Sequence, residues 1–333
     1  MNTTQKTKLI SWFTACKTWS NDGRYGEGQL LGKFFDYIEI RTKITSTFTF
    51  MLTIGFLLYQ RQEMQWKKTF VFFMGMFFFD LTTTAINNYI DSKDNGQVLP
   101  FARKKSLLII YALFGISTAF GLYLAYSTDL VILVIGGICF ISGVLYTYGP
   151  LPISRMPLGE VVSGFFYGVV IPFILMYINM PVGTFMTYSL SFETVSLSVQ
   201  VVPVLTLLLF SITPFAATAN VMLANNICDL EKDITVKRYT LPYYIGKKMA
   251  LPLFAGLYYM TYVSTILLVV FGILSPVVLI SLLTIVPVQK NINRFFKKQE
   301  KATTFGISIV NFILIMGGST LAVFLSVILD RIM

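Results

Sequence analysis

The sequence has no histidine and only three cysteines, Cys16, Cys139 and Cys228, which are far apart. This absence excludes a disulfide framework, and it leaves zinc sites and haem-attachment motifs without their usual ligands. Any bound metal ion must therefore be held by oxygen atoms. Oxygen-only sites suit hard cations such as Mg²⁺ and Ca²⁺.

Charge is also scarce, because only 13% of the 333 residues are charged and 55% are hydrophobic. Soluble domains usually have about 25% charged residues. Mean hydropathy is +0.70, and several apolar runs reach the roughly 20 residues that cross a bilayer core. These runs lie near residues 44–60, 69–90, 106–127, 130–149, 159–180, 201–228, 251–273, 274–291 and 305–329. The predicted fold class is all-α integral membrane, with nine transmembrane helices.

Basic residues indicate the orientation of these helices, because lysine and arginine accumulate in cytoplasmic loops. With the N-terminus inside, 22 of the 26 basic residues lie on the cytoplasmic side. We therefore expect a multi-pass protein of the cell membrane, most simply a bacterial plasma membrane, with a cytoplasmic N-terminus. The net charge of +10 favours anionic membrane lipids and anionic substrates, and nothing else in the sequence supports nucleic-acid binding.

The chain divides at the first apolar run. Residues 1–43 form a predicted cytoplasmic tail without the apolar core and small residues of a cleaved signal peptide. Apolar residues between Leu9 and Trp19 are compatible with a short interfacial helix or with a disordered tail. Residues 44–333 are predicted to form a single transmembrane domain.

Two similar motifs, Asn-Asn-x-x-Asp, close the second and sixth apolar runs. They begin the segments 87–95 and 225–233. The motifs lie four spans apart on equivalent cytoplasmic helix ends, which is typical of a tandem repeat related by an axis along the membrane normal. The domain is therefore predicted to contain two pseudo-repeats.

The spacing within each motif predicts a row of oxygen ligands. Asn87 and Asp91 are four residues apart, as are Asn225, Asp229 and Asp233, so each set lies on one helix face. If the two helices lean together, Mg²⁺ ions could join both rows to the phosphates of a diphosphate. A single acid at a helix end is usually only solvated, but the duplication favours a functional site.

Asp80 lies about three helical turns inside the membrane, on the same face as Asn87 and Asp91. An ionisable residue at such a depth is a functional candidate. It could assist the hydroxyl group or the proton loss of an acceptor. The alternative is an aspartate bonded to a neighbouring helix.

Basic residues near both motifs are candidates for charge-assisted bonds to a diphosphate. Arg155 is the strongest of them, because it is the only base in its loop and follows the compact segment 146–150. The full set comprises Arg41, Lys43, Arg103, Lys104, Lys105, Arg155, Lys232, Lys237 and Arg238. Most also satisfy the positive-inside rule.

These segments together resemble the UbiA superfamily of intramembrane prenyltransferases, which also has nine spans. Its first signature, N-D-x-x-D-x-x-x-D, falls on Asn87, Asp91 and a displaced Asp94, and its second, D-x-x-x-D, falls on Asp229 and Asp233. The resemblance implies a UbiA-type bundle and adds Asp94 to the metal ligands. Two departures are visible, because asparagine replaces the expected acids at positions 88 and 95.

The branch most similar to this sequence is the 1,4-dihydroxy-2-naphthoate polyprenyltransferases of menaquinone biosynthesis. These proteins carry N-N-x-x-D-x-x-x-D followed by a basic pair and T-L, as do residues 225–241 here. They also have a Y-T-x-G-P-x-P-I segment running into L-G-E, similar to residues 146–153 and 158–160.

The resemblance implies transfer of a polyprenyl group from its diphosphate to an aromatic acceptor, with Mg²⁺ as the cofactor and demethylmenaquinone as the product. The implied catalytic residues are Asp91, Asp229 and Asp233, and Asp80 is added to them because of its depth in the membrane. Asn87, Asn225, Arg41, Lys43, Arg155, Lys237 and Arg238 would bind the diphosphate. Tyr146, Tyr148 and Asn88 would line the pocket for the prenyl cation and the acceptor, although interfacial tyrosines are often anchors.

Two alternatives remain open from the sequence. The same scaffold could use another acceptor, such as 4-hydroxybenzoate, haem or a glycerophosphate ether. A cation transporter would also need paired acids, but it would place them near the middle of the membrane, whereas both motifs lie at span ends.

Overall fold

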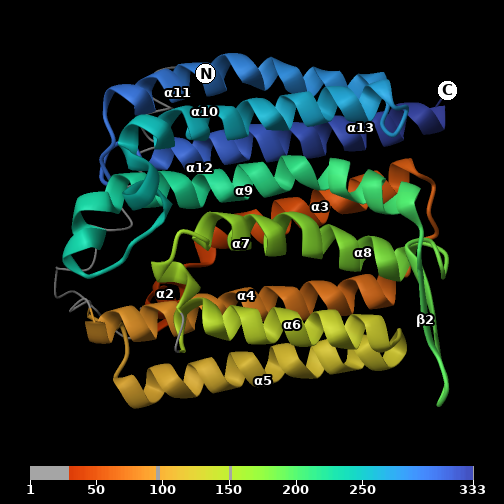
Figure 1. The fold of residues 1–333 in the computed structure, drawn as a ribbon, viewed down its shortest axis with the longest axis horizontal. Helices are drawn as coiled ribbons and strands as arrows, with labels where there is room; N and C mark the ends of the chain where they lie inside the picture. Colours follow the sequence, from red (N-terminus) through yellow and green to blue (C-terminus); the bar gives the residue numbers. More distant parts are fainter. Residues whose placement is uncertain (1–29, 95–97, 150–151, 333) are drawn as a thin grey trace.

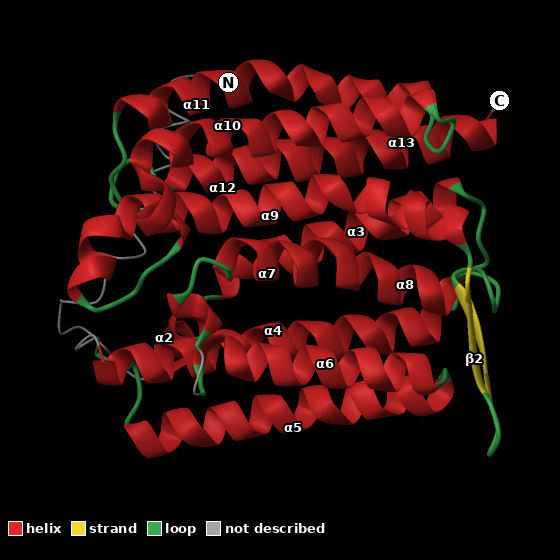
Figure 2. Ribbon diagram, in the orientation of Figure 1, coloured by secondary structure: helices red, strands yellow, loops and turns green. Residues whose placement is uncertain are grey.

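A bundle of long, roughly parallel helices makes up the protein (Figures 1 and 2). The computed structural model describes residues 30–94, 98–149 and 152–332. Within these residues, eight helices are long and apolar enough to cross a membrane, and one apolar helix, α3 (Ile44–Tyr59), is shorter. This confirms the predicted all-helical membrane fold and the nine apolar segments.

The remaining helical elements follow in chain order. They are α2 (Leu30–Tyr37), η3 (Ile40–Lys43), α4 (Trp66–Asp94), α5 (Arg103–Ser127), α6 (Leu130–Thr147), η4 (Ile153–Arg155), α7 (Gly159–Phe165), η5 (Phe166–Val170), α8 (Ile171–Asn179), α9 (Val201–Thr235), α10 (Leu241–Val270), η6 (Pro276–Thr284), α11 (Ile285–Lys297), α12 (Gly306–Phe312), η7 (Ile313–Gly317) and α13 (Gly318–Ile332). The π-helical turns η5 and η7 join α7 to α8 and α12 to α13, so each series forms one span.

Helices satisfy their own backbone polar groups, which membrane-spanning segments require. Small and polar residues then fix the contacts between them. A Cβ atom on Gly168 would lie 2.3 Å from the backbone nitrogen of Phe215, so glycine allows η5 to approach α9 closely. The amide of Asn220 on α9 donates to the carbonyl of Phe254 on α10 at 2.7 Å.

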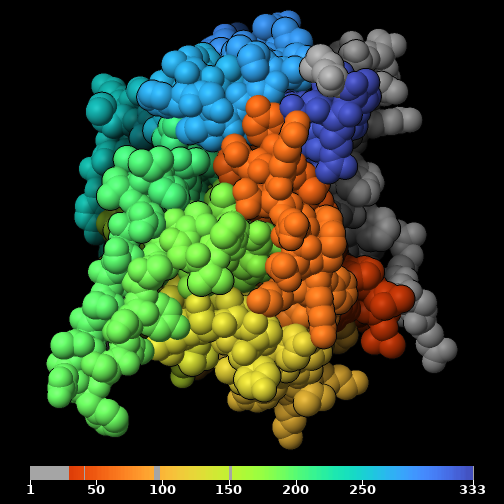
Figure 3. All heavy atoms as spheres, turned by 90° about the vertical axis from the view of Figure 1, so that its right-hand side faces the viewer, coloured from red at the N-terminus to blue at the C-terminus, as the bar shows by residue number. Residues whose placement is uncertain are grey.

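A β-hairpin connects α8 to α9, and the sequence analysis did not predict it. Strands β1 (Met186–Leu190) and β2 (Val195–Val199) pair in antiparallel register. Tyr188 lies opposite Leu197, whereas Thr187 lies opposite Ser198, so apolar and polar pairs alternate. The hairpin runs across the helix ends in Figure 1 and extends beyond them in Figure 3.

Both motif-bearing helices end at the opposite end of the bundle from the hairpin. The C-terminal ends of α4 and α9 point the same way, and α7 lies between the two helices (Figure 1). Helix α7 packs against α9, while α6 packs against α4 and α5. This arrangement gives each motif its own set of neighbouring elements.

Candidate functional site

The second motif forms a row on one face of α9, which extends to Thr235. Asn225, Asp229 and Asp233 are spaced by four residues and so lie above one another along the helix. Lys301, from the loop between α11 and α12, reaches this row. Its Nζ atom donates to Oδ2 of Asp229 at 2.6 Å and also to Oδ1 of Asn225.

Asp233 ends the row and is almost fully buried. Its Oδ1 atom lies 3.9 Å from Nε of Arg238, and its Oδ2 atom has no hydrogen-bond partner within the protein. The Arg238 amide donates to the Asp233 carbonyl at 2.8 Å, which closes a turn after α9. A buried carboxylate oxygen without a donor is available to a cation.

The turn after α9 also contacts the loop that contains η4. The Arg238 guanidinium donates to the carbonyl of Ser154 at 3.1 Å, and the Tyr239 amide donates to the carbonyl of Arg155 at 3.1 Å. Lys237 is exposed and adopts a positive φ of 55°. The structure therefore brings the loops of Arg155 and Arg238 together beside the second motif.

Asn226 accepts a hydrogen bond from the Asn225 amide at 3.5 Å and also reaches a neighbouring helix. Its amide donates to Oε1 of Glu160 on α7 at 2.8 Å, and both side chains are buried. The other carboxylate oxygen of Glu160 has no protein partner. This contact ties α7 to the motif helix.

The first motif lies near the end of α4, and its two asparagines are bonded to other elements. Asn87 accepts a hydrogen bond from Thr147 on α6 at 3.3 Å. Asn88 donates to the Tyr37 carbonyl at 2.9 Å and to a Glu39 carboxylate oxygen at 3.4 Å. Asp91 is half-buried. The side chain of Asp94, a predicted ligand, lies outside the described part of the structure, as do that of Arg41 and all of Asn95.

Asp80 accepts hydrogen bonds from three surrounding side chains in the interior of the bundle. Nζ of Lys43 lies 2.8 Å from its Oδ1 atom, and the Tyr167 hydroxyl donates to the same oxygen at 2.7 Å. Ser46 donates to Oδ2 at 2.7 Å. Lys43 also donates to the Thr84 hydroxyl at 2.5 Å. Both ions of the Lys43–Asp80 pair are buried, with only 4% and 5% of their side chains exposed.

The two candidate pocket tyrosines differ in their surroundings. The Tyr146 hydroxyl lies 3.3 Å from the Ser163 hydroxyl on α7, and the side chain is half-buried. Tyr148 follows the last residue of α6 and is 65% exposed. Tyr146 is therefore the tyrosine that faces a neighbouring helix.

No three acidic side chains among the described residues come close enough to share one metal ion. Helix α7 lies between the two helices that carry the motifs (Figure 1). Convergence of both rows on one diphosphate remains a prediction.

Three residues beside the candidate site were not identified from the sequence. Lys301 looks like any other base of its cytoplasmic loop, and Tyr167 like any other aromatic residue of a membrane span. Glu160 belongs to the Leu-Gly-Glu segment, but nothing in that pattern indicates that it contacts Asn226. Only tertiary packing shows these contacts.

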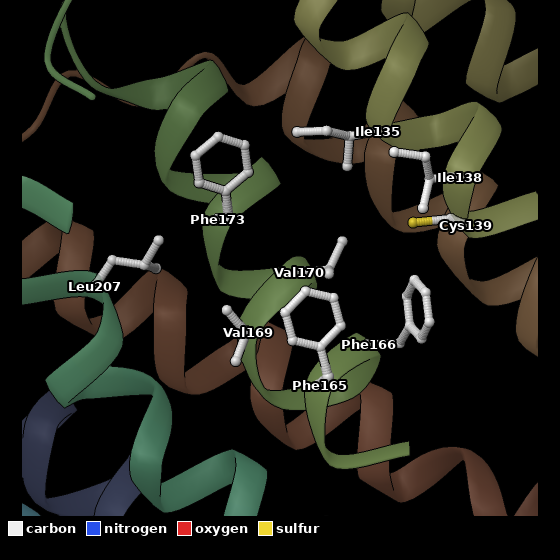
Figure 4. Close-up of a pocket in the computed structure, with 9 residues that line it drawn as sticks. All are labelled: Ile135, Ile138, Cys139, Phe165, Phe166, Val169, Val170, Phe173 and Leu207. Carbon is white, nitrogen blue, oxygen red and sulfur yellow. The ribbon is translucent and has the colours of Figure 1, made fainter. Parts of the chain in front are cut away.

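An apolar cavity of about 250 Å³ lies between α6, the α7–η5–α8 span and α9. In Figure 4 the labelled side chains point into a common space, with Cys139 and Ile138 from α6 facing Phe166. All nine lining residues are apolar or cysteine: Ile135, Ile138, Cys139, Phe165, Phe166, Val169, Val170, Phe173 and Leu207.

Known proteins show what this chain resembles. A 226-residue alignment is 27% identical to 1,4-dihydroxy-2-naphthoate octaprenyltransferase of Bacillus subtilis (strain 168), and it covers 63% of this chain and 66% of that protein, just under two thirds of its length.

Solved structures share the fold at low sequence identity. A UbiA homolog from Aeropyrum pernix K1 has a TM-score of 0.61 at 15% identity, covering 87% of this chain and 98% of its own. A digeranylgeranylglyceryl phosphate synthase has a TM-score of 0.60 at 16% identity, with coverage of 90% and 98%. A UbiA homolog from Archaeoglobus fulgidus bound to GPP and Mg²⁺ has a TM-score of 0.56 at 14% identity, with coverage of 86% and 99%.

The family assignment rests on most of the chain. Residues 48–328 match the UbiA prenyltransferase family, a range that includes both motifs and all spans except the first residues of α3 and the last residues of α13. The protein therefore belongs to the UbiA prenyltransferase family.

Proposed function

We propose that the protein transfers a polyprenyl group from a polyprenyl diphosphate to an aromatic acceptor, 1,4-dihydroxy-2-naphthoate, in a reaction that requires Mg²⁺. The observation that carries this proposal is the oxygen row Asn225, Asp229 and Asp233 on one face of α9, with Arg238 in the turn that follows. The row offers ligands for a cation, and the turn offers a donor for the phosphates that the cation would bind.

The residues present fit Mg²⁺. All donors are hard oxygens, and the buried Oδ2 of Asp233 has no protein partner. Mg²⁺ usually binds one or two carboxylates and completes its shell with water and phosphate oxygens, which agrees with a row of two acids. Asn87, Asp91 and Asp94 would form the second ligand set. When bound, Mg²⁺ would withdraw charge from the diphosphate and so weaken the allylic C–O bond.

Basic residues would hold the diphosphate from several sides. Arg155, Lys237 and Arg238 lie on two loops that contact each other at the end of α9. Their charged donors can bind phosphate oxygens. Arg41 and Lys43, which precede the first span, would bind the diphosphate from the side of the first motif.

Asp80 would act through Lys43. The Asp80 carboxylate already accepts hydrogen bonds from Lys43, Ser46 and Tyr167. Its proposed role is therefore to orient the Lys43 ammonium group. In this proposal Asp80 positions Lys43 and does not take a proton from the acceptor.

The apolar surroundings would accommodate the prenyl chain and protect its cation. The cavity of Figure 4 is lined by aliphatic, aromatic and cysteine side chains, which suit an isoprenoid and exclude water. The ring of Tyr146 could stabilise the cation, with Asn88 and Tyr148 at the edge of the acceptor pocket.

The proposed reaction exchanges the carboxylate of the naphthoate for the prenyl group. The allylic C–O bond breaks and its electron pair leaves with the diphosphate. The ring carbon that carries the carboxylate of the naphthoate forms the new C–C bond, and loss of that carboxylate as CO₂ restores the aromatic ring. The product is a demethylmenaquinol, the reduced form of demethylmenaquinone.

Two further parts of the proposal rest on sequence patterns. The basic-residue bias supports a motif-bearing end in the cytoplasm of a bacterial cell, with lipids around residues 44–333 and residues 1–43 as a cytoplasmic tail. The naphthoate acceptor is supported by the 27% identical relative and by the segments 146–153 and 225–241.

A product assay tests the proposal. Purified protein would be incubated with Mg²⁺, polyprenyl diphosphates of several lengths and one of four acceptors: 1,4-dihydroxy-2-naphthoate, 4-hydroxybenzoate, haem or a glycerophosphate ether. Mass spectrometry should detect a prenylated, decarboxylated naphthalene product, with one diphosphate released per product. Prenylation of another acceptor alone would refute the naphthoate assignment. Failure with every acceptor would refute the proposed activity.

A further inference from the structure

Lys301 places a positive charge directly on the second motif. Its ammonium group contacts both Asn225 and Asp229, and it lies 4.5 Å from the ring centroid of Phe305. The Lys301 and Asp229 side chains are only 23% and 22% exposed, so solvent screens their attraction less than at an open surface. The contact therefore neutralises one acid of the row.

The backbone that carries Lys301 is held in a tight turn. The carbonyl of Glu300 accepts hydrogen bonds from the amides of Thr304 at 2.9 Å and Phe305 at 3.1 Å. The Thr304 hydroxyl in turn accepts from the Glu300 amide at 2.8 Å. The backbone is thus fixed, while the four-carbon side chain of lysine can move its ammonium group by rotation.

An ammonium group and a divalent cation cannot share these ligands. Lys301 uses the same oxygens, Oδ1 of Asn225 and Oδ2 of Asp229, that a metal ion would use. Two cations held a few ångströms apart also repel each other. Binding of a metal ion at the row therefore requires Lys301 to leave Asp229.

We propose that Lys301 is the resident counter-ion of the second motif and a diphosphate-binding residue of the loaded site. It neutralises Asp229 before substrate arrives, leaves when the metal ion enters, and then donates to an oxygen of the diphosphate. This inference rests on the proposed function of the motif. Its consequence is that metal and diphosphate bind cooperatively, because the diphosphate supplies the partner that Lys301 would otherwise lose.

Titration with Mn²⁺ tests this role without relying on turnover. Wild type, Lys301→Gln and Lys301→Arg would be titrated in detergent, with and without inorganic pyrophosphate, at matched free Mn²⁺. Without pyrophosphate, Lys301→Gln should bind Mn²⁺ about tenfold more tightly, because a competing charge is gone. Pyrophosphate should tighten Mn²⁺ binding strongly in wild type and less in Lys301→Gln. Lys301→Arg, which retains the charge, should resemble wild type.

Lys298→Gln is the matched control. Lys298 belongs to the same loop, but its Nζ atom bonds Glu300 at 2.9 Å and so keeps the pKa of that exposed carboxyl below its usual value. Its removal takes away one positive charge and should leave Mn²⁺ affinity unchanged. Melting curves in EDTA would establish that each variant is folded.

The variant Asp229→Ala distinguishes failure of the Lys301 proposal from failure of the proposed metal site. If Asp229→Ala abolishes Mn²⁺ binding while Lys301→Gln changes neither Mn²⁺ affinity nor its dependence on pyrophosphate, the role of Lys301 is overturned and the metal site stands. If Asp229→Ala binds Mn²⁺ as wild type does, the proposed metal site itself is overturned.

Discussion

The ends of α4 and α9 carry the same five-residue motif in different surroundings. On α9, Asn225 and Asp229 face Lys301, and Asp233 lies beside Arg238. On α4, the motif asparagines are bonded to neighbouring elements rather than to lysine or arginine. The same sequence pattern therefore has different contacts in the two places, because the neighbouring elements differ.

The neighbours differ because different elements pack against α4 and α9. Helix α4 contacts α2 and η3, and Tyr37 of α2 offers its carbonyl to Asn88. Helix α9 packs against α10 and α12, so the loop preceding α12 brings Lys301 to the motif. We expect the second motif to provide the stronger metal site and the first to assist it.

Removal of one acid from each motif should show the difference between the two motifs most clearly. Asp229→Ala should lower the rate of prenyl transfer by about 10³-fold, because an electrostatic contact to the reacting diphosphate is lost. Asp91→Ala should lower it by about 10²-fold by the same reasoning. Initial rates of diphosphate release at saturating Mg²⁺ would measure both. Equal losses would contradict the predicted difference between the motifs.

Loss of Asp80 should produce the next largest effect, on stability. Asp80→Ala leaves the Lys43 ammonium group buried without its carboxylate, which we expect to cost about 3–5 kcal/mol. The double variant Asp80→Leu with Lys43→Met removes both charges and should melt closer to wild type. Thermal unfolding in detergent would measure this difference. An Asp80→Ala variant as stable as wild type would show that the pair does not hold η3 to α4.

The contact between α7 and α9 should be less costly to remove. Glu160→Ala leaves the buried amide of Asn226 without its acceptor, which should destabilise the protein by about 1–3 kcal/mol. Glu160→Gln retains an acceptor oxygen and serves as the control. If the two variants melt at the same temperature, the Glu160–Asn226 hydrogen bond is not what stabilises this contact.

Restoration of the family acid in the first motif should have the smallest effect. Asn88→Asp removes the donor to the Tyr37 carbonyl and adds a negative charge near Glu39, so we expect a loss of about 1 kcal/mol. Because the side chain points to Tyr37, Mg²⁺ dependence should not change. A lower Mg²⁺ requirement in Asn88→Asp would show that position 88 is a metal-ligand position in this chain.

Sequence patterns predicted the fold well because the membrane imposes simple rules. Length and apolarity alone located all nine segments, and the motif spacing placed Asn225, Asp229 and Asp233 on one helical face. Two structural features were beyond this reasoning. The β-hairpin lies in a stretch without a membrane-length apolar run, and the early start of α10 at Leu241 includes a bend at Gly246, where φ is 71°.

The environment of the candidate site was harder to predict than its motif. Nothing distinguishes Lys301 from Lys297 or Lys298 in the sequence, because all three satisfy the positive-inside rule. Likewise, nothing in the sequence around Lys43 indicates that its ammonium group lies inside the bundle, 2.8 Å from a carboxylate oxygen of Asp80. These contacts depend on how distant segments pack, which local spacing does not encode.

Metal binding to the α9 row is the central claim, and it can be measured directly. Electron paramagnetic resonance would follow Mn²⁺ bound to the purified protein with an unreactive prenyl thiodiphosphate. We predict a bound Mn²⁺ signal with phosphorus couplings in wild type, a weaker but detectable one in Asp91→Ala, and none in Asp229→Ala. An unchanged signal in Asp229→Ala would contradict the assignment of the second motif as the principal metal and diphosphate site.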